Sequence, residues 1–277
     1  MRRLMIALLT LLLVSGMAAC SRTNTDQPGS VGPDDNGTNK TNNANNIDSG
    51  SSTIASVTLS AKIMEMKGTS FLAANMAKDA NNGDIYWINA EKADVIGASG
   101  SKLESDALKV GMLVDIVYSG VVMESFPMGL GGVKSIQIKE EPDDIAGLYT
   151  SVIKDLYETD EGLNSGIERI AFDFSGISNL TETEKTALVY RLGNSYGLEA
   201  IRGTFDELSE QGYIDKEKLS FETGLLFTIK VSTAKKDRFI FDANKWRGGD
   251  GADYYNNCTA IKANGSWTYT IGSSAIS

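Results

Sequence analysis

Residues 245–255 combine side chains suited to recognising a ligand. Trp246 offers a large rigid apolar face and Arg247 a planar set of donors, and both residue types dominate binding hot spots. Asp250 and Asp253 follow among three glycines and could orient Arg247 or meet a cation. A two-residue turn suffices to join two strands, so the extra length suggests a use. We predict a binding loop at Trp246, Arg247, Asp250 and Asp253, and the alternative is a structural hairpin loop with Trp246 in the core.

Catalytic patterns are weak throughout the chain. Histidine is absent, which removes Ser–His and Cys–His nucleophile pairs and most zinc sites. Residues 151–154 and 232–235 match the Ser-x-x-Lys of penicillin-binding enzymes, but the partner Lys-Thr-Gly is missing. Cys258 lies in a predicted strand and is expected to be a buried structural thiol. We predict no catalytic residue, no metal site and no cofactor, although carboxylates are numerous enough for glycoside hydrolysis.

The first 20 residues have the parts of an export signal. Two arginines precede an apolar run over residues 4–14, which is shorter than the roughly 20 residues of a membrane-spanning helix. Met17-Ala18-Ala19-Cys20 resembles the lipobox of bacterial lipoproteins, with methionine where leucine is usual. The resemblance implies removal of residues 1–19 and a lipid anchor on Cys20, at the extracytoplasmic face of the cell membrane. The alternative is an ordinary signal peptide followed by an accidental cysteine.

Residues 20–56 are predicted to be the lipidated cysteine and a disordered tether. The tether contains no aromatic residue, and Val31, Ile47 and Ile54 are its only aliphatic residues larger than alanine. Such a segment buries too little apolar surface to fold, and its reach is roughly 30 to 36 Å. Two of the 26 basic residues lie in the signal, so the mature chain has 24 basic and 36 acidic residues and a net charge of −12. This charge argues against nucleic acid as a partner.

Residues 57–140 are predicted to form a small all-β domain. Val57, Leu59, Ala61 and Ile63 alternate with polar residues, as in a half-buried strand. Further short strands are predicted around residues 71–72, 85–88, 113–118, 121–125 and 133–138, with clusters of glycine and asparagine between them. Short strands at this spacing without a helix are typical of a small barrel or sandwich.

Four segments of this region resemble a known family. They are Leu108-Lys109-Val110-Gly111, residues 114–120, Glu124-Ser125-Phe126-Pro127 and residues 133–136. They resemble the YobA-like barrel domain of unknown function found in lipoproteins of Gram-positive bacteria. The resemblance covers less than a third of the chain and implies an OB-like β-barrel and an envelope location. It implies no catalytic residue.

Residues 141–277 are predicted to form an α+β domain. Apolar residues from Ile145 to Tyr157 recur at helical spacing. Capping boxes begin two further helices at Thr181 and Thr204, which are expected to end at Gly197 and near Gly212. Strands are predicted at residues 170–174, 225–231, 239–241, 254–261 and 267–271, with Asn264-Gly265 as a type I′ turn. The expected arrangement is helices covering one face of an antiparallel sheet.

These observations favour a lipid-anchored envelope protein of two folded domains that is not an enzyme. Its partner is expected to be an envelope protein, a wall polymer or a small ligand. The alternative is an envelope glycan hydrolase that uses paired carboxylates, which facing Asp or Glu residues in a pocket of the second domain would favour. The sequence leaves open which ligand is bound and whether either domain is catalytic.

Overall fold

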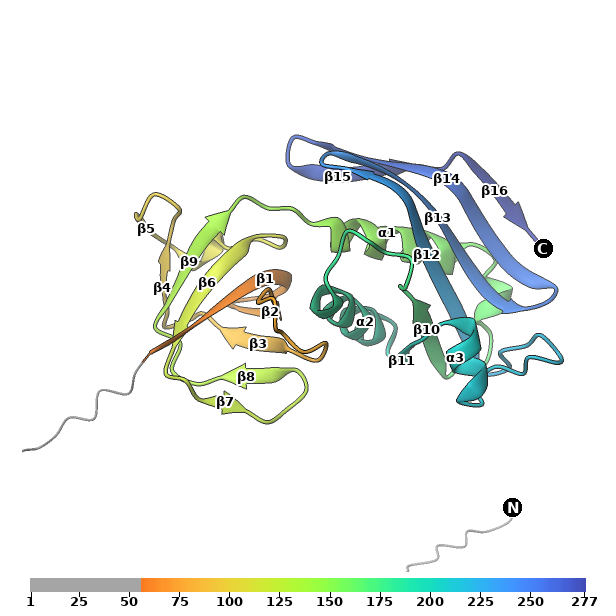
Figure 1. The fold of residues 1–277 in the computed structure, drawn as a ribbon, viewed down its shortest axis with the longest axis horizontal. Helices are drawn as coiled ribbons and strands as arrows, with labels where there is room; N and C mark the ends of the chain where they lie inside the picture. Colours follow the sequence, from red (N-terminus) through yellow and green to blue (C-terminus); the bar gives the residue numbers. More distant parts are fainter. Residues whose placement is uncertain (1–55) are drawn as a thin grey trace, which may run out of the picture. The chain divides into compact units, whose positions relative to one another are not determined.

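A computed structural model describes residues 56–277. The predicted signal peptide, Cys20 and nearly all of the predicted tether lie outside the described residues. The described residues form two sheets and three α-helices, and the helices belong to the second half of the chain (Figure 1). The prediction of an all-β region followed by an α+β region is confirmed at this level.

Nine strands make the first sheet. They are β1 (Val57–Lys67), β2 (Ser70–Asn75), β3 (Ile85–Asn89), β4 (Asp94–Ile96), β5 (Lys102–Leu103), β6 (Leu113–Tyr118), β7 (Val122–Met123), β8 (Met128–Leu130) and β9 (Ser135–Glu140). Their order is β5-β4-β9-β6-β1-β2-β3-β8-β7. The sheet curls (Figure 1), but its end strands β5 and β7 do not pair within the described residues. A closed OB-like barrel is therefore not confirmed.

Burial differs among the central strands of the first sheet, because β2 is buried on both faces and β6 on one. In β6 the exposure of the side chains alternates, with Val114, Ile116 and Tyr118 buried, which is the period of two that a pleated strand imposes. Gly111 lies in the turn before β6 with a φ of +87°, and a Cβ there would lie 2.7 Å from the backbone nitrogen of Asp144. Only glycine fits this turn, because the chain leading to the next helix passes directly over it.

The second sheet contains seven strands. They are β10 (Arg169–Asp173), β11 (Glu199–Arg202), β12 (Gly224–Lys235), β13 (Arg238–Gly248), β14 (Gly251–Ala263), β15 (Ser266–Thr270) and β16 (Ser273–Ile276). The order is β11-β10-β12-β13-β14-β15, with β16 also paired to β14. β10 is parallel to both β11 and β12, and the remaining pairs are antiparallel. The predicted antiparallel sheet is confirmed for β12 to β16, but β10 pairs in parallel, because each of its neighbours is reached through a helix and so returns in the same direction.

The three helices begin and end close to their predicted residues. They are α1 (Ile145–Glu158), α2 (Glu182–Tyr196) and α3 (Phe205–Glu210). Thr181 and Thr204 cap α2 and α3 through complete capping boxes, and Gly197 ends α2 with a φ of +63°. No helix among the described residues is long and apolar enough to cross a membrane.

The helices cover both faces of the second sheet. Apolar residues of α1 and α2 share one core with Ile170 and Phe172 of β10. Leu208 of α3 packs instead with Ala171 of the same strand. Successive residues of a strand point to opposite faces, so α3 lies on the face opposite α1 and α2. The expectation that all helices lie on one face is therefore wrong.

α2 also contacts the first sheet. The Thr183 hydroxyl donates to the Asn75 carbonyl at 2.7 Å. Lys62 Nζ lies 2.9 Å from a carboxylate oxygen of Glu184, and both side chains are largely buried. The boundary predicted at residue 141 falls between the end of β9 and the start of α1. The division into two domains at this boundary stays a prediction.

Candidate functional site

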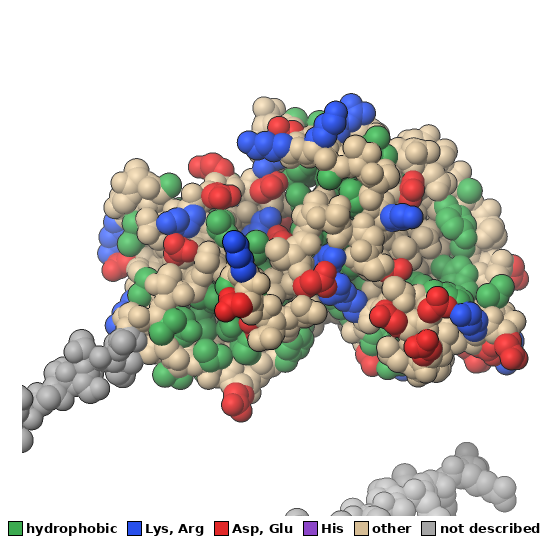
Figure 2. Space-filling model, in the orientation of Figure 1, with side chains coloured by type: hydrophobic (Ala, Val, Ile, Leu, Met, Phe, Trp, Pro, Cys, Tyr) green, Lys and Arg blue, Asp and Glu red, His purple; other side chains and the backbone are tan. Residues whose placement is uncertain are grey.

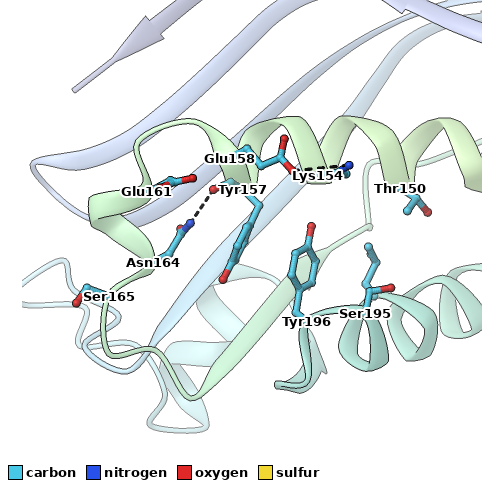
Figure 3. Close-up of a pocket in the computed structure, with 10 residues that line it drawn as sticks. Thr150, Lys154, Tyr157, Glu158, Glu161, Asn164, Ser165, Ser195 and Tyr196 are labelled. Carbon is cyan, nitrogen blue, oxygen red and sulfur yellow. Dashed lines mark hydrogen bonds and ion pairs between the residues drawn. The ribbon is translucent and has the colours of Figure 1, made fainter.

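A cavity of about 530 Å³ lies between α1 and α2, open to solvent, and is called the tyrosine cleft below (Figure 3). The residues that line it are Thr150, Lys154, Tyr157, Glu158, Glu161, Asn164, Ser165, Leu192, Ser195 and Tyr196. Its volume lies within the range of about 300 to 1,000 Å³ that is usual for ligand pockets. Its lining mixes aromatic rings, hydroxyl groups and charges of both signs.

The spacing of residues along α1 and α2 explains how the tyrosine cleft forms. Thr150, Lys154 and Tyr157 recur at helical intervals, so they share one side of α1, next to its buried apolar stripe. Tyr196 is the last residue of α2. The left-handed Gly197 then turns the chain away and leaves the Tyr196 ring at the end of the helix.

The rings of Tyr157 and Tyr196 pack against each other at the cleft. Their centroids are 4.4 Å apart and their planes differ by 33°, which is a close, tilted stack. Burial, and then the neighbouring Tyr157, Glu158 and Asp155, raise the pKa of Tyr196 to about 12. The Tyr196 hydroxyl therefore keeps its proton near neutral pH and can donate a hydrogen bond to a ligand.

Polar groups surround the two rings (Figure 3). Lys154 Nζ lies 3.7 Å from a carboxylate oxygen of Glu158, and both side chains are exposed. Asn164 Nδ2 donates to the Tyr157 carbonyl at 2.7 Å. The Asn164 Oδ1 atom is buried and accepts no hydrogen bond within the described part of the chain. Such an unused acceptor is uncommon in a folded protein.

The far wall of the cleft is the short 3-10 helix η2 (Glu161–Asn164). Arg247 of β13 holds this wall from the sheet, because its Nη1 atom donates to the carbonyls of Leu163 at 2.6 Å and Ser165 at 2.7 Å. Its Nη2 atom donates to the Glu222 carbonyl at 2.9 Å. Arg247 therefore positions the segment that carries Asn164.

Lys245 holds the chain just before η2. Its ammonium group donates to the carbonyls of Thr159 and Asp160, the latter at 3.2 Å. It also pairs with Asp253 at 3.0 Å, and both side chains are fully buried. Neither carboxylate oxygen of Asp253 has another hydrogen bond in the described residues. Lys245 therefore compensates the cost of burying the Asp253 carboxylate, since a buried carboxylate without a partner lowers the stability of the fold.

The predicted long loop at residues 245–255 is wrong. β13 continues to Gly248 and β14 starts at Gly251, which leaves a two-residue turn with Asp250 exposed. Trp246 packs edge-on against Phe205 of α3, with ring centroids 5.3 Å apart. It therefore lies on the face opposite the contacts of Lys245 and Arg247. The structure does not bring Trp246, Arg247, Asp250 and Asp253 to one cavity, and their binding role stays a prediction.

Other sequence candidates have structural partners. Ser151 and Ser232, from the two Ser-x-x-Lys matches, donate to the carbonyls of Gly147 and Ile240. Cys258 is buried, as predicted. Burial raises the pKa of the Cys258 thiol to about 11, which makes it a poor nucleophile at neutral pH.

A smaller cavity of about 310 Å³ lies at the carboxyl ends of β10 and β11. The chain leaves these neighbouring strands toward opposite faces of the sheet, the arrangement at which open α/β sheets commonly bind ligands. Its carboxylates already have protein partners: Asp173 accepts from Ser175 and Glu182 pairs with Arg202. The described residues contain no group of three or more potential metal ligands.

The sequence did not identify the tyrosine cleft. The sequence pattern places Tyr157 in the apolar stripe of α1 and does not distinguish Tyr196 from other helical residues. The available signal was a tyrosine at the edge of a stripe and another just before a helix-ending glycine. Neither the known protein families nor the curated proteins show a match to this chain. Its function is therefore inferred from the geometry of the tyrosine cleft.

Proposed function

We propose that this chain is a lipid-anchored extracytoplasmic protein that binds a saccharide unit of a cell-wall polymer in the tyrosine cleft. The anchor rests on the lipobox resemblance at Cys20. The saccharide rests on one observation, the paired rings of Tyr157 and Tyr196 in an open, polar-rimmed cleft.

The chemistry of a sugar ring matches this lining. A pyranose has an apolar face of C–H groups and an edge of hydroxyl groups. An aromatic ring offers an apolar surface to the C–H face of the sugar. Hydroxyl, amide and charged side chains form hydrogen bonds with its hydroxyl groups. Tyr196 and Ser195 supply neutral hydroxyl groups at the cleft, and Lys154 supplies a cation for a phosphate or carboxylate on the polymer.

A second candidate function is hydrolysis of the same polymer, because Glu158 and Glu161 both line the cleft. A glycosidase needs one carboxyl group that stays protonated, usually in an apolar, water-poor setting. The Glu158 side chain is instead 58% exposed and lies beside Lys154. Glu158 therefore lacks the apolar, water-poor setting of such an acid, so we place binding before hydrolysis.

We further propose that the curled first sheet is a relative of the OB-like, YobA-like barrel. The support is the sequence resemblance over residues 108–136 and the alternating burial of β6. In this proposal the first sheet follows the membrane tether in the chain, and the helices α1 and α2 form the ligand cleft.

Co-sedimentation with purified cell-wall sacculi tests the binding proposal. Tyr196→Ala should weaken retention by roughly tenfold, because stacked aromatic contacts contribute on the order of 1 kcal/mol beyond burial and the cleft loses one of two rings. Tyr196→Phe should retain most binding. Tyr254→Ala is the control, since Tyr254 is an exposed tyrosine of β14 that does not line the cleft.

The same incubation separates the two candidate functions. Binding without release of new reducing ends supports the binding protein. Release that disappears in Glu158→Gln or Glu161→Gln supports the hydrolase. If wild type, Tyr196→Ala and Tyr157→Ala were retained equally, the cleft would take part in neither binding nor hydrolysis of the polymer.

A further inference from the structure

An exposed apolar segment joins the first sheet's β6 and β8. It is called the apolar loop here and comprises residues 121–126. Its side chains are exposed by 54% at Val121, 41% at Val122, 53% at Met123 and 63% at Phe126. Figure 2 shows apolar side chains gathered over the part of the molecule where Figure 1 places β7 and β8. Adjacent exposed apolar residues of this size commonly mark a contact surface.

The backbone of the apolar loop is well held. β7 pairs with β8, and the Gly131 N–H donates to the Val121 carbonyl at 2.9 Å. Ser125 Oγ donates to the Pro127 carbonyl at 2.7 Å. These bonds fix the loop along the side of β7 that faces β8, so its apolar side chains are held in place at the end of the sheet.

The loop lies near the point where the chain enters the sheet. β1 and β6 are antiparallel, and Val57 pairs with Tyr118. Tyr118 ends β6, three residues before Val121. The entry point and the apolar loop are therefore at the same end of the β1–β6 pair. Val57 is itself an exposed apolar residue, and 36 residues separate it from Cys20.

The charge of the loop favours a neutral partner. Residues 121–132 contain no lysine or arginine and one acidic residue, Glu124. Electrostatic attachment to anionic lipid needs a basic cluster, so this loop cannot use it. An apolar segment can still enter the boundary between headgroups and acyl chains, with the Glu124 carboxylate left among the headgroups.

We infer that the apolar loop inserts its side chains into the lipid bilayer that carries the Cys20 anchor. This inference rests on the anchor in the proposed function. The tether brings the loop's end of the sheet toward the membrane, and the loop then holds the first sheet at the lipid surface. Insertion of the loop then raises the fraction of chains whose first sheet touches the membrane, because the Cys20 anchor already keeps the loop at a high local concentration near the lipid.

Vesicle flotation tests the insertion. The mature chain with Cys20→Ala, which has no lipid, is mixed with vesicles of phosphatidylcholine alone or with added phosphatidylglycerol. We expect measurable flotation with phosphatidylcholine, little effect of salt, and less flotation with the anionic mixture. Val122→Ser with Phe126→Ser should reduce flotation by about fivefold or more, because it removes two of four inserting side chains.

Ile261→Ser with Ile271→Ser is the matched control, since these comparably exposed residues belong to the second sheet region. It should float like the parent chain, and thermal unfolding of both variants verifies the fold. Equal flotation of parent and Val122/Phe126 variant, or no flotation of either, would overturn the insertion. A parent dimer that the Val122/Phe126 variant converts to monomer would overturn it in favour of self-association. Two results together would refute the anchor and leave the insertion intact. They are flotation that depends on Val122 and Phe126, and no lipid labelling of the chain that keeps Cys20.

Discussion

Arg247 and Leu163 are joined by a hydrogen bond of 2.6 Å from the guanidinium Nη1 atom to the backbone carbonyl. This bond ties a strand of the second sheet to the wall of the tyrosine cleft. Arg247 thus positions the wall of the cleft without lining the cleft itself.

Arg247→Ala should lower both stability and binding. It leaves the carbonyls of Leu163, Ser165 and Glu222 without their donor, at a cost of about 1 to 3 kcal/mol. Urea unfolding measures the stability, and sacculus binding measures the cleft. Asp250→Ala, at the exposed turn, is the control and should change neither. An unchanged unfolding midpoint for Arg247→Ala would restore the original interpretation of Arg247 as a free ligand-binding group.

The Lys245–Asp253 pair should behave as a unit. Lys245→Met leaves the Asp253 carboxylate buried without a partner and should cost about 3 to 5 kcal/mol. Adding Asp253→Leu should recover much of that loss, because an apolar pair needs no compensating charge. A double-mutant cycle by urea unfolding checks this expectation. Additive losses would contradict the pairing.

The free energy of unfolding should fall at alkaline pH, because burial keeps several tyrosines protonated in the native chain. Burial raises the pKa of Tyr149, Tyr196 and Tyr269, in Tyr196 to about 12. Between the unfolded and native pKa values the native chain holds more protons, so the unfolding free energy falls as pH rises. For Tyr196 the contribution is complete below pH 10 and is lost by about pH 12. Tyr196→Phe should show a shallower loss over that window in urea unfolding, while Tyr254→Phe should match the parent.

Cys258 should be protected from thiol reagents until the chain unfolds. It is buried in β14, and the raised pKa leaves little thiolate at neutral pH. In Cys20→Ala it is the only cysteine, since the chain has two. Labelling should therefore follow the urea unfolding curve. Rapid labelling of the native chain would show an opening of β14 that the structure does not contain.

Cys20→Ala should abolish lipid labelling and cleavage after Ala19, because the acyl group and the cleavage both require the cysteine thiol in a lipoprotein signal. A fatty-acid probe and the mass of the mature chain provide the measurements. Cys258→Ser is the control and should label normally. Lipid on the Cys20→Ala chain would show that the anchor assignment is wrong.

Local sequence rules predicted the helices well. The apolar spacing from Ile145 gave α1, and the capping boxes at Thr181 and Thr204 gave α2 and α3. Asn264-Gly265 was also right, since both residues have positive φ and join β14 to β15. These features depend on contacts between residues a few positions apart, which a sequence states directly.

Features that depend on distant pairing were missed. β11 (Glu199–Arg202) is short, half-exposed and without alternation, so its parallel pairing with β10 was not predicted. The cleft joins Tyr157 and Tyr196 from different helices, a contact that no local pattern announces. The three glycines after Arg247 suggested a long loop, but β13 and β14 continue to within two residues of each other.

The bonds from β13 to the segment around η2 also set an order of assembly. Lys245 and Arg247 lie 82 to 86 residues after the carbonyls in residues 159–165 that they hold. Contacts of such long sequence separation form late, because the intervening chain must first be arranged. In chain order α1 and α2 precede the strand that braces the segment between α1 and β10. The wall of the tyrosine cleft is therefore braced only after β13 has docked, and a product truncated before β13 would keep both tyrosines and η2 but lack the residues that hold η2 in place.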